Sequence, residues 1–174
     1  MEVGSTHHIK DIVYGANDGI ITTFAVVASV AGASLSVPIV LVIGLASLFA
    51  DGFSMAASNY LGTKSEHDAL CADAGMPCTH SKSHRPLLAG AITFVAFVSA
   101  GLVPLLPFAL LPTAVNIFPY AVLSTACALF LVGASRSIIT GKSALSSGAE
   151  MLAVGGIAAA IAYYVGAIVR DIVG

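Results

Sequence analysis

The chain has 174 residues, of which 57% are hydrophobic and only 9% are charged, whereas a typical soluble domain carries roughly 25% charged residues. Its mean hydropathy is +0.96. So little charge cannot cover a surface that faces water, but it suits a surface that faces lipid. The seven Lys and Arg residues form no cluster, which excludes a nucleic-acid-binding patch, and the net charge of −2 is too small to indicate a partner.

The N-terminal residues 1–10 are polar and include His7 and His8. They lack the basic start, apolar stretch and cleavage site of a signal peptide, so we expect a tail that is retained and not translocated. The first two spans follow from an uncharged run of 32 residues between Asp18 and Asp51. One helix of that length would measure about 48 Å, well beyond the ~30 Å hydrocarbon core.

Turn residues at 32–38 interrupt this run and indicate a helical hairpin. Two spans and a turn need roughly 45 residues, so the hairpin must extend past both aspartates. We expect spans near 12–34 and 38–63, which places both carboxylates inside the membrane.

A second uncharged run, between Arg85 and Arg136, has 50 residues and a Pro-rich centre, and a third, from Met151 to Val169, has 19. They predict a second hairpin and one final span. These spans are expected at 86–110, 114–138 and 149–170. The sequence therefore predicts an all-α integral membrane protein, a bundle of five transmembrane helices forming one domain over residues 1–174.

Lys and Arg favour the cytoplasmic loops of membrane proteins. With the N-terminus in the cytoplasm, six of the seven fall on that side, and Arg170 alone falls outside. The polar loop 64–85 is then cytoplasmic. Short loops and the lack of a targeting segment favour a prokaryotic cell membrane, with a vacuolar or other organelle membrane as the alternative.

Small residues line one face of the first span, where Gly15 and Gly19 form a GxxxG motif that Ala28 and Gly32 continue. Such a face lets membrane helices approach closely. It indicates either packing within the chain or the seam of a dimer.

The aspartates are the first candidates for chemistry. A charged side chain deep in a bilayer costs several kcal/mol unless it is paired or hydrated, so Asp18 and Asp51 indicate a polar pathway, unless each reaches water at the interface. Asp51, Met55 and Asn59 are four residues apart and share one helix face. Carboxylate and amide oxygens suit hard divalent ions, and a thioether tolerates softer ones such as ferrous iron, although Met55 alone would equally suit the core.

Proton exchange follows from the same burial. A buried carboxyl favours its neutral form, whereas a metal ion requires the ionised form and expels protons when it binds. The loop 64–85 adds further potential ligands, and transient metal capture or a solvated polar loop are both open, because the spacing matches no standard zinc site. These residues are Glu66, His67, Asp68, Cys71, Cys78, His80 and His84.

The stretches 11–25 (DIVYGANDGIITTFA), 51–66 (DGFSMAASNYLGTKSE) and 155–166 (GGIAAAIAYYVG) resemble the vacuolar iron transporter family. The resemblance implies five transmembrane helices, a homodimer, and Fe²⁺ or Mn²⁺ carried out of the cytosol against protons. It also implies that Asp18 and Met55 line the ion path at the dimer interface.

The chain departs from plant members of the family at two places. Ser47 stands where they have a glutamate, which Asp51 one turn later can replace. The short loop 64–85 stands where they have a long, glutamate-rich cytoplasmic domain.

We therefore expect a transporter that carries Fe²⁺, or Mn²⁺ next, in exchange for protons. Its partners would be the metal, protons, the lipid bilayer and a second copy, with no permanently bound cofactor and no nucleic acid. The first pathway candidates are Asp18 and Met55, followed by Asp51 and Asn59. Delivery at the cytoplasmic mouth is assigned to Glu66, His67, Cys71, Cys78, His80 and His84.

Two other functions are open. The first is a membrane-anchored metal sensor or scaffold that binds metal through the Cys/His loop without transport. The second keeps transport but carries a softer ion, favoured by Cys71 and Cys78. An enzyme is not expected, because the sequence offers no HExxH or GxSxG motif and no recognisable nucleophile–base pair.

Overall fold

The computed structural model describes residues 3–73, 85–111, 116–137, 141 and 143–173, and the regular elements within these ranges are all helical. The elements are α1 (Val3–Gly32), α2 (Val37–Asp73), α3 (Pro86–Gly101), the 3₁₀-helix η1 (Val103–Leu105), α4 (Leu106–Leu110), α5 (Phe118–Ser135) and α7 (Ala144–Val173). Five segments of these ranges are long and apolar enough to cross a membrane, with α3, η1 and α4 counted as one. The prediction of an all-α, five-span membrane protein is thus confirmed.

The break between the first two spans is a tight turn. Ser34 has a positive φ of 56°, and the amide N–H groups of Ser34 and Leu35 donate to the carbonyls of Ala31 and Val30 at 3.0 Å. This is the Schellman pattern that satisfies the last carbonyls of a helix. It reverses the chain within four residues, so α1 and α2 run antiparallel.

Helix α2 is longer than the sequence analysis expected. It continues to Asp73, so the first ten residues of the segment 64–85, expected to be loop, are helical. The reason is local: residues 64–73 contain no Gly or Pro, and Lys, Glu, Ala and Leu among them favour helices. At 37 residues the helix measures about 55 Å and projects well beyond the ~30 Å hydrocarbon core.

The third span changes helix type near its end, where prolines interrupt the hydrogen-bond ladder. Pro104 lies in the 3₁₀ segment, in which the Leu105 amide donates to the carbonyl of Leu102 at 3.0 Å. Because proline has no N–H to donate, it cannot continue an α-helical ladder. The span still covers Pro86–Leu110 in total.

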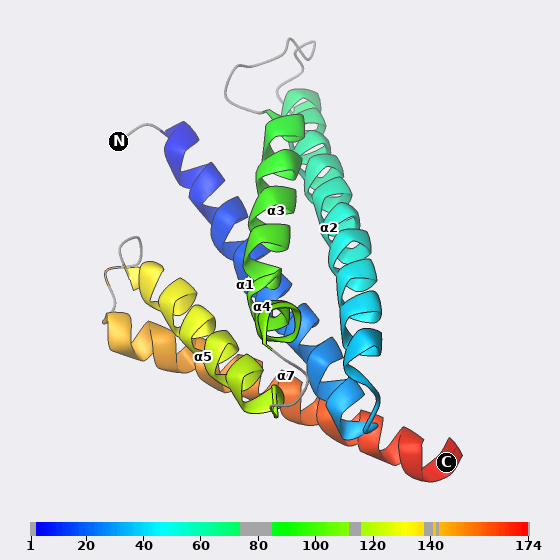
Figure 1. Cartoon of the computed structure of the whole chain (residues 1–174). Helices are drawn as coiled ribbons and strands as arrows, with labels where there is room; N and C mark the ends of the chain where they lie inside the picture. The colour runs from blue at the N-terminus through cyan, green and yellow to red at the C-terminus, as the bar shows by residue number, and fades with distance from the viewer. Residues whose placement is uncertain (1–2, 74–84, 112–115, 138–140, 142, 174) are drawn as a thin grey trace.

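Helix α3 packs against both α1 and α2, whereas α5 pairs with α7, which also crosses α1. In Figure 1 the first three helices run side by side, and α5 and α7 form a pair inclined to them. The core between the elements includes Phe24, Val27, Leu48 and Phe97, all buried.

The GxxxG motif of α1 is used within the chain. A Cβ at Gly15 would lie 2.7 Å from the backbone oxygen of Thr93, and a Cβ at Gly19 would collide with the backbone of Phe97. These two glycines therefore let α1 and α3 approach at backbone distance. Of the two alternatives that the sequence left open, the structure favours intrachain packing over a dimer seam at this motif.

Candidate functional site

Asp18 and Asp51 lie level with each other on α1 and α2. Asp18 lies 14 residues before the end of α1 at Gly32, and Asp51 lies 14 residues after the start of α2 at Val37. Each is therefore about 21 Å along its helix from the connecting turn. Because α1 and α2 contact each other, the two acids lie on neighbouring spans. Both residues belong to segments able to cross a membrane, at a depth that lies within a ~30 Å hydrocarbon core when the turn is at one surface.

The Asp18 carboxyl is half-buried. One turn on, Thr22 Oγ1 donates to the backbone oxygen of Asp18 at 2.7 Å, so that hydroxyl hydrogen is used within α1. The adjacent Asn17 Oδ1 is buried and receives no hydrogen bond from the residues that the structure describes. A buried oxygen without a donor requires an explanation, and beside a carboxylate it is well suited to face a cation or a water molecule.

Asp51 lies on a face of α2 that the chain itself leaves uncovered. The residue is exposed. Phe49 and Phe53, each two positions from it in the chain and therefore on another face of α2, are also exposed, at 52% and 71%. An ionised carboxylate facing lipid costs several kcal/mol. The isolated chain thus leaves an acidic side chain uncovered within a membrane-spanning segment.

Met55 lies one turn beyond Asp51 and is half-buried. Its side chain packs against the main hydrophobic core. The structure therefore gives this residue a packing contact, and its half exposure leaves room for the thioether to reach a ligand on the same face.

Asn59 forms a polar junction between three helices. Its Nδ2 donates to Asp11 Oδ1 of α1 at 2.9 Å and to Thr93 Oγ1 of α3 at 2.7 Å, with the Ala89 carbonyl at 3.3 Å. The amide nitrogen of this predicted pathway residue is therefore engaged in holding helices together. Sequence reasoning did not single out Asp11 as a site residue. The sequence feature that could have indicated Asp11 is its position two helical turns before Asp18, as an acidic residue in an otherwise apolar stretch.

The other predicted ligands lie on the extension of α2 or beyond it. Glu66 is exposed, and His67 is half-buried, with its Nδ1 3.7 Å from Cys71 Sγ and 3.8 Å from Asp68 Oδ1. Cys71 lies one turn beyond His67, which brings these two side chains together. Three further predicted ligands lie outside the described residues: Cys78, His80 and His84. Within the described residues, no three His, Cys, Asp or Glu side chains are grouped to hold a metal ion.

Five apolar membrane-spanning segments, two of which carry acidic side chains at the same level, define a multi-pass integral membrane protein with a polar region inside its spans. A family model described as the VIT family matches residues 9–77 and 70–167. The chain belongs to this family. The two matched pieces overlap at 70–77, a stretch that includes the end of α2 at Asp73 and belongs to the segment expected to be shorter than in plant members.

Known relatives align along most of the chain. Vacuolar iron transporter 1 of Arabidopsis thaliana is 27% identical, with 93% of this chain and 86% of the relative aligned. The vacuolar iron transporter of Centaurea cyanus is 26% identical over 89% of this chain and 85% of the relative. That of Toxoplasma gondii is 26% identical over 98% of this chain and 77% of the relative.

Proposed function

We propose that this protein moves a divalent transition metal ion, Fe²⁺ first and Mn²⁺ next, out of the cytosol in exchange for protons. The observation that carries the proposal is the level pair of carboxylates, Asp18 and Asp51, within two membrane-spanning segments. The relatives named vacuolar iron transporters support the choice of metal.

The chemistry of the site residues fits such an ion. Carboxylate oxygens bind hard divalent cations, and the thioether of Met55 adds a ligand that Fe²⁺ accepts more readily than Ca²⁺ or Mg²⁺ does. The orphan oxygen of Asn17 supports a cation close to Asp18. We assign Asn59 a structural role, because its amide nitrogen donates hydrogen bonds to Asp11 and Thr93.

Exchange follows from two carboxylates held at the same level on neighbouring spans. In a low-dielectric environment two nearby negative charges are stabilised either by a cation between them or by a proton on one of them. A metal ion that arrives displaces a proton, and a proton that returns releases the metal. The same pair therefore supports binding and release at one depth.

The proposed assembly is a homodimer that covers the open face of α2. Asp51 is exposed within the span formed by α2, and a second copy placed against it would remove the carboxylate from lipid. Two copies would also contribute two sets of Asp18 and Met55 to one path. The excess of positive charges on the side of the N-terminus supports a cytoplasmic location for that side.

The test is metal uptake into proteoliposomes under an imposed pH gradient. Wild-type protein should take up Fe²⁺ faster with the gradient than without it. Asp18→Asn should lower uptake to the level of empty vesicles, because the substitution removes the charge and keeps the size. Asp73→Asn, the same change on an exposed residue at the end of α2, is the matched control and should transport normally.

Two results would contradict the proposal. Wild-type protein that binds Fe²⁺ but moves none would identify a metal sensor or scaffold. Asp18→Asn protein that is folded and transports at the wild-type rate would remove the carboxylate pair from the mechanism.

A further inference from the structure

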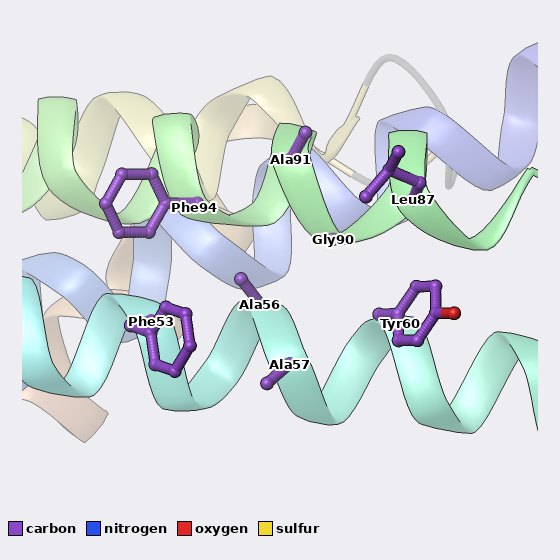
Figure 2. Close-up of a pocket in the computed structure, with 8 residues that line it drawn as sticks. All are labelled: Phe53, Ala56, Ala57, Tyr60, Leu87, Gly90, Ala91 and Phe94. Atoms are coloured by element: carbon purple, nitrogen blue, oxygen red, sulfur yellow. The ribbon is translucent and has the colours of Figure 1, made fainter.

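A groove runs along the outside of the bundle between α2 and α3 (Figure 2). Its volume of 340 Å³ lies near the lower limit of small-molecule sites. The Tyr60 hydroxyl is the one polar side-chain group among the lining residues, which are Phe53, Ala56, Ala57, Tyr60, Leu87, Gly90, Ala91 and Phe94.

Small residues make the groove and aromatic residues close it. A Cβ at Gly90 would lie 2.8 Å from the backbone oxygen of Ala56, so the two helices are in near-backbone contact at this level. Figure 2 shows Phe53 and Phe94 at one end of the groove and Tyr60 at the other, with only short side chains between them. Tyr60 lies seven positions after Phe53, a distance of about 10 Å along the helix, which suits a narrow, elongated apolar ligand.

Two positive charges lie just beyond the Tyr60 end. Lys64 follows Tyr60 by one turn and shares its helix face, and Arg85 directly precedes α3, two residues before Leu87. Both are exposed. Within the described ranges neither Lys64 nor Arg85 forms a hydrogen bond or ion pair through its side chain. Asp68, one turn beyond Lys64, lies beside His67.

The position in the membrane identifies the occupant. Tyrosine and snorkelling Lys or Arg side chains mark the interface between hydrocarbon and headgroups, and the Tyr60 hydroxyl points towards that end of the groove. An apolar slot topped by two cations that have no partner among the described residues complements a molecule with one hydrocarbon chain and an anionic head. We propose that the groove holds an acyl chain of an anionic phospholipid, whose phosphate is bound by Lys64 and Arg85.

The test counts lipids bound to the full-length protein. The chain is purified in mild detergent, stripped of lipid, and titrated with palmitoyl-oleoyl phosphatidylglycerol or with phosphatidylcholine of the same chains, and bound lipid is measured by native mass spectrometry. Wild-type protein should bind one phosphatidylglycerol per chain about tenfold more tightly than phosphatidylcholine. A phosphatidylglycerol with a photoreactive acyl chain should label the α2 and α3 peptides that carry Phe53 and Phe94.

Two pairs of variants separate the acyl site from the headgroup site. Ala91→Phe should fill the groove and abolish the tight site, whereas Ala160→Phe, the same change on an exposed residue of α7, should keep it. Lys64→Gln with Arg85→Gln should lower phosphatidylglycerol affinity to that of phosphatidylcholine, whereas Lys10→Gln should leave the preference unchanged. Thermal melting in detergent verifies that each variant is folded.

The proposal is overturned by any of three results. Folded Ala91→Phe protein could bind lipid like wild type, the double charge variant could keep the preference, or the photoreactive chain could label other helices of wild-type protein. Cross-links between two chains through Ala91 would identify a second copy as the occupant and would also reject the lipid. These measurements of lipid binding use no transported metal, so their outcome is independent of whether the proposed transport function is correct.

Discussion

The side-chain amide of Asn59 donates a hydrogen bond of 2.9 Å to the Asp11 carboxylate, joining α2 to α1. The same nitrogen donates to Thr93 Oγ1 at 2.7 Å, and Thr93 in turn donates to the Ala89 carbonyl at 3.0 Å. One amide thus ties three membrane-spanning helices together. Polar contacts between membrane helices specify how the helices pack when little hydrophobic force distinguishes protein from lipid.

We expect Asn59→Ala to lower the free energy of unfolding by about 1–3 kcal/mol, because it removes two donors from partly buried acceptors. The measurement is thermal or denaturant unfolding in detergent. Ser58→Ala, at the exposed neighbouring position, should change stability little. Combining Asn59→Ala with Thr93→Val should give less than the sum of the single effects, since the two residues share a hydrogen bond. Strictly additive effects would show that the junction is not a unit.

A second prediction concerns the contact of α1 with α3. Gly19→Ala should lower stability by about 1–3 kcal/mol, because the new Cβ meets the backbone of Phe97, which cannot move aside as a flexible side chain could. Gly156→Ala is the matched control, because nothing lies within 4 Å of a Cβ at Gly156, and alanine there should be neutral or slightly stabilising. Unfolding midpoints in detergent provide the comparison, and equal midpoints for the two variants would contradict the close packing.

The thioether of Met55 gives a third prediction. Met55→Leu conserves volume and should leave the fold intact, but it should reduce transport of Fe²⁺ roughly tenfold and transport of Mn²⁺ less, because the softer ion depends more on sulfur. Met151→Leu, at a buried core position, is the control and should transport both ions normally. The readout is competitive uptake of the two ions into proteoliposomes. An unchanged ratio of the two rates would assign Met55 to packing alone.

The open face of α2 gives a fourth prediction. With the three native cysteines replaced by serine, Ala50→Cys on the exposed face beside Asp51 should form disulfide-linked dimers in membranes. Ala160→Cys on the exposed face of α7 should not. Cross-linking is read from non-reducing gels after mild oxidation. Monomers throughout, or dimers through α7 alone, would remove the second copy from the α2 face.

Charge-free runs were sufficient to predict the five spans, because the cost of burying charge in lipid dominates every other local preference. The expected end of α2 at residue 63 is wrong, because the helix continues to Asp73. Polar residues begin after Thr63, but a helix continues through polar residues as long as no Gly or Pro interrupts it. Length arithmetic also placed Asp18 and Asp51 within membrane-spanning segments.

What could not be predicted depended on partners far apart in the chain. Asn59 and Asp11 are separated by 48 positions, so a four-residue periodicity could assign Asn59 to a face but not to a hydrogen bond. The GxxxG motif likewise fits any partner helix until the position of Phe97 is known. The residues of the expected cytoplasmic capture site from Cys78 to His84 lie outside the described part, so that assignment stays a prediction.

Because the turn at Ser34 is short, the lengths of α1 and α2 counted from it determine where Asp18 and Asp51 lie relative to each other. Each residue added to or removed from α1 or α2 between this turn and the acidic pair would shift one carboxylate by about 1.5 Å and rotate it by about 100° relative to the other. The alignment of the two acids at one level therefore depends on the number of residues in α1 and α2 between the acids and the turn. A one-residue insertion or deletion in either helix close to the turn would therefore misalign the acids without altering any residue beside them.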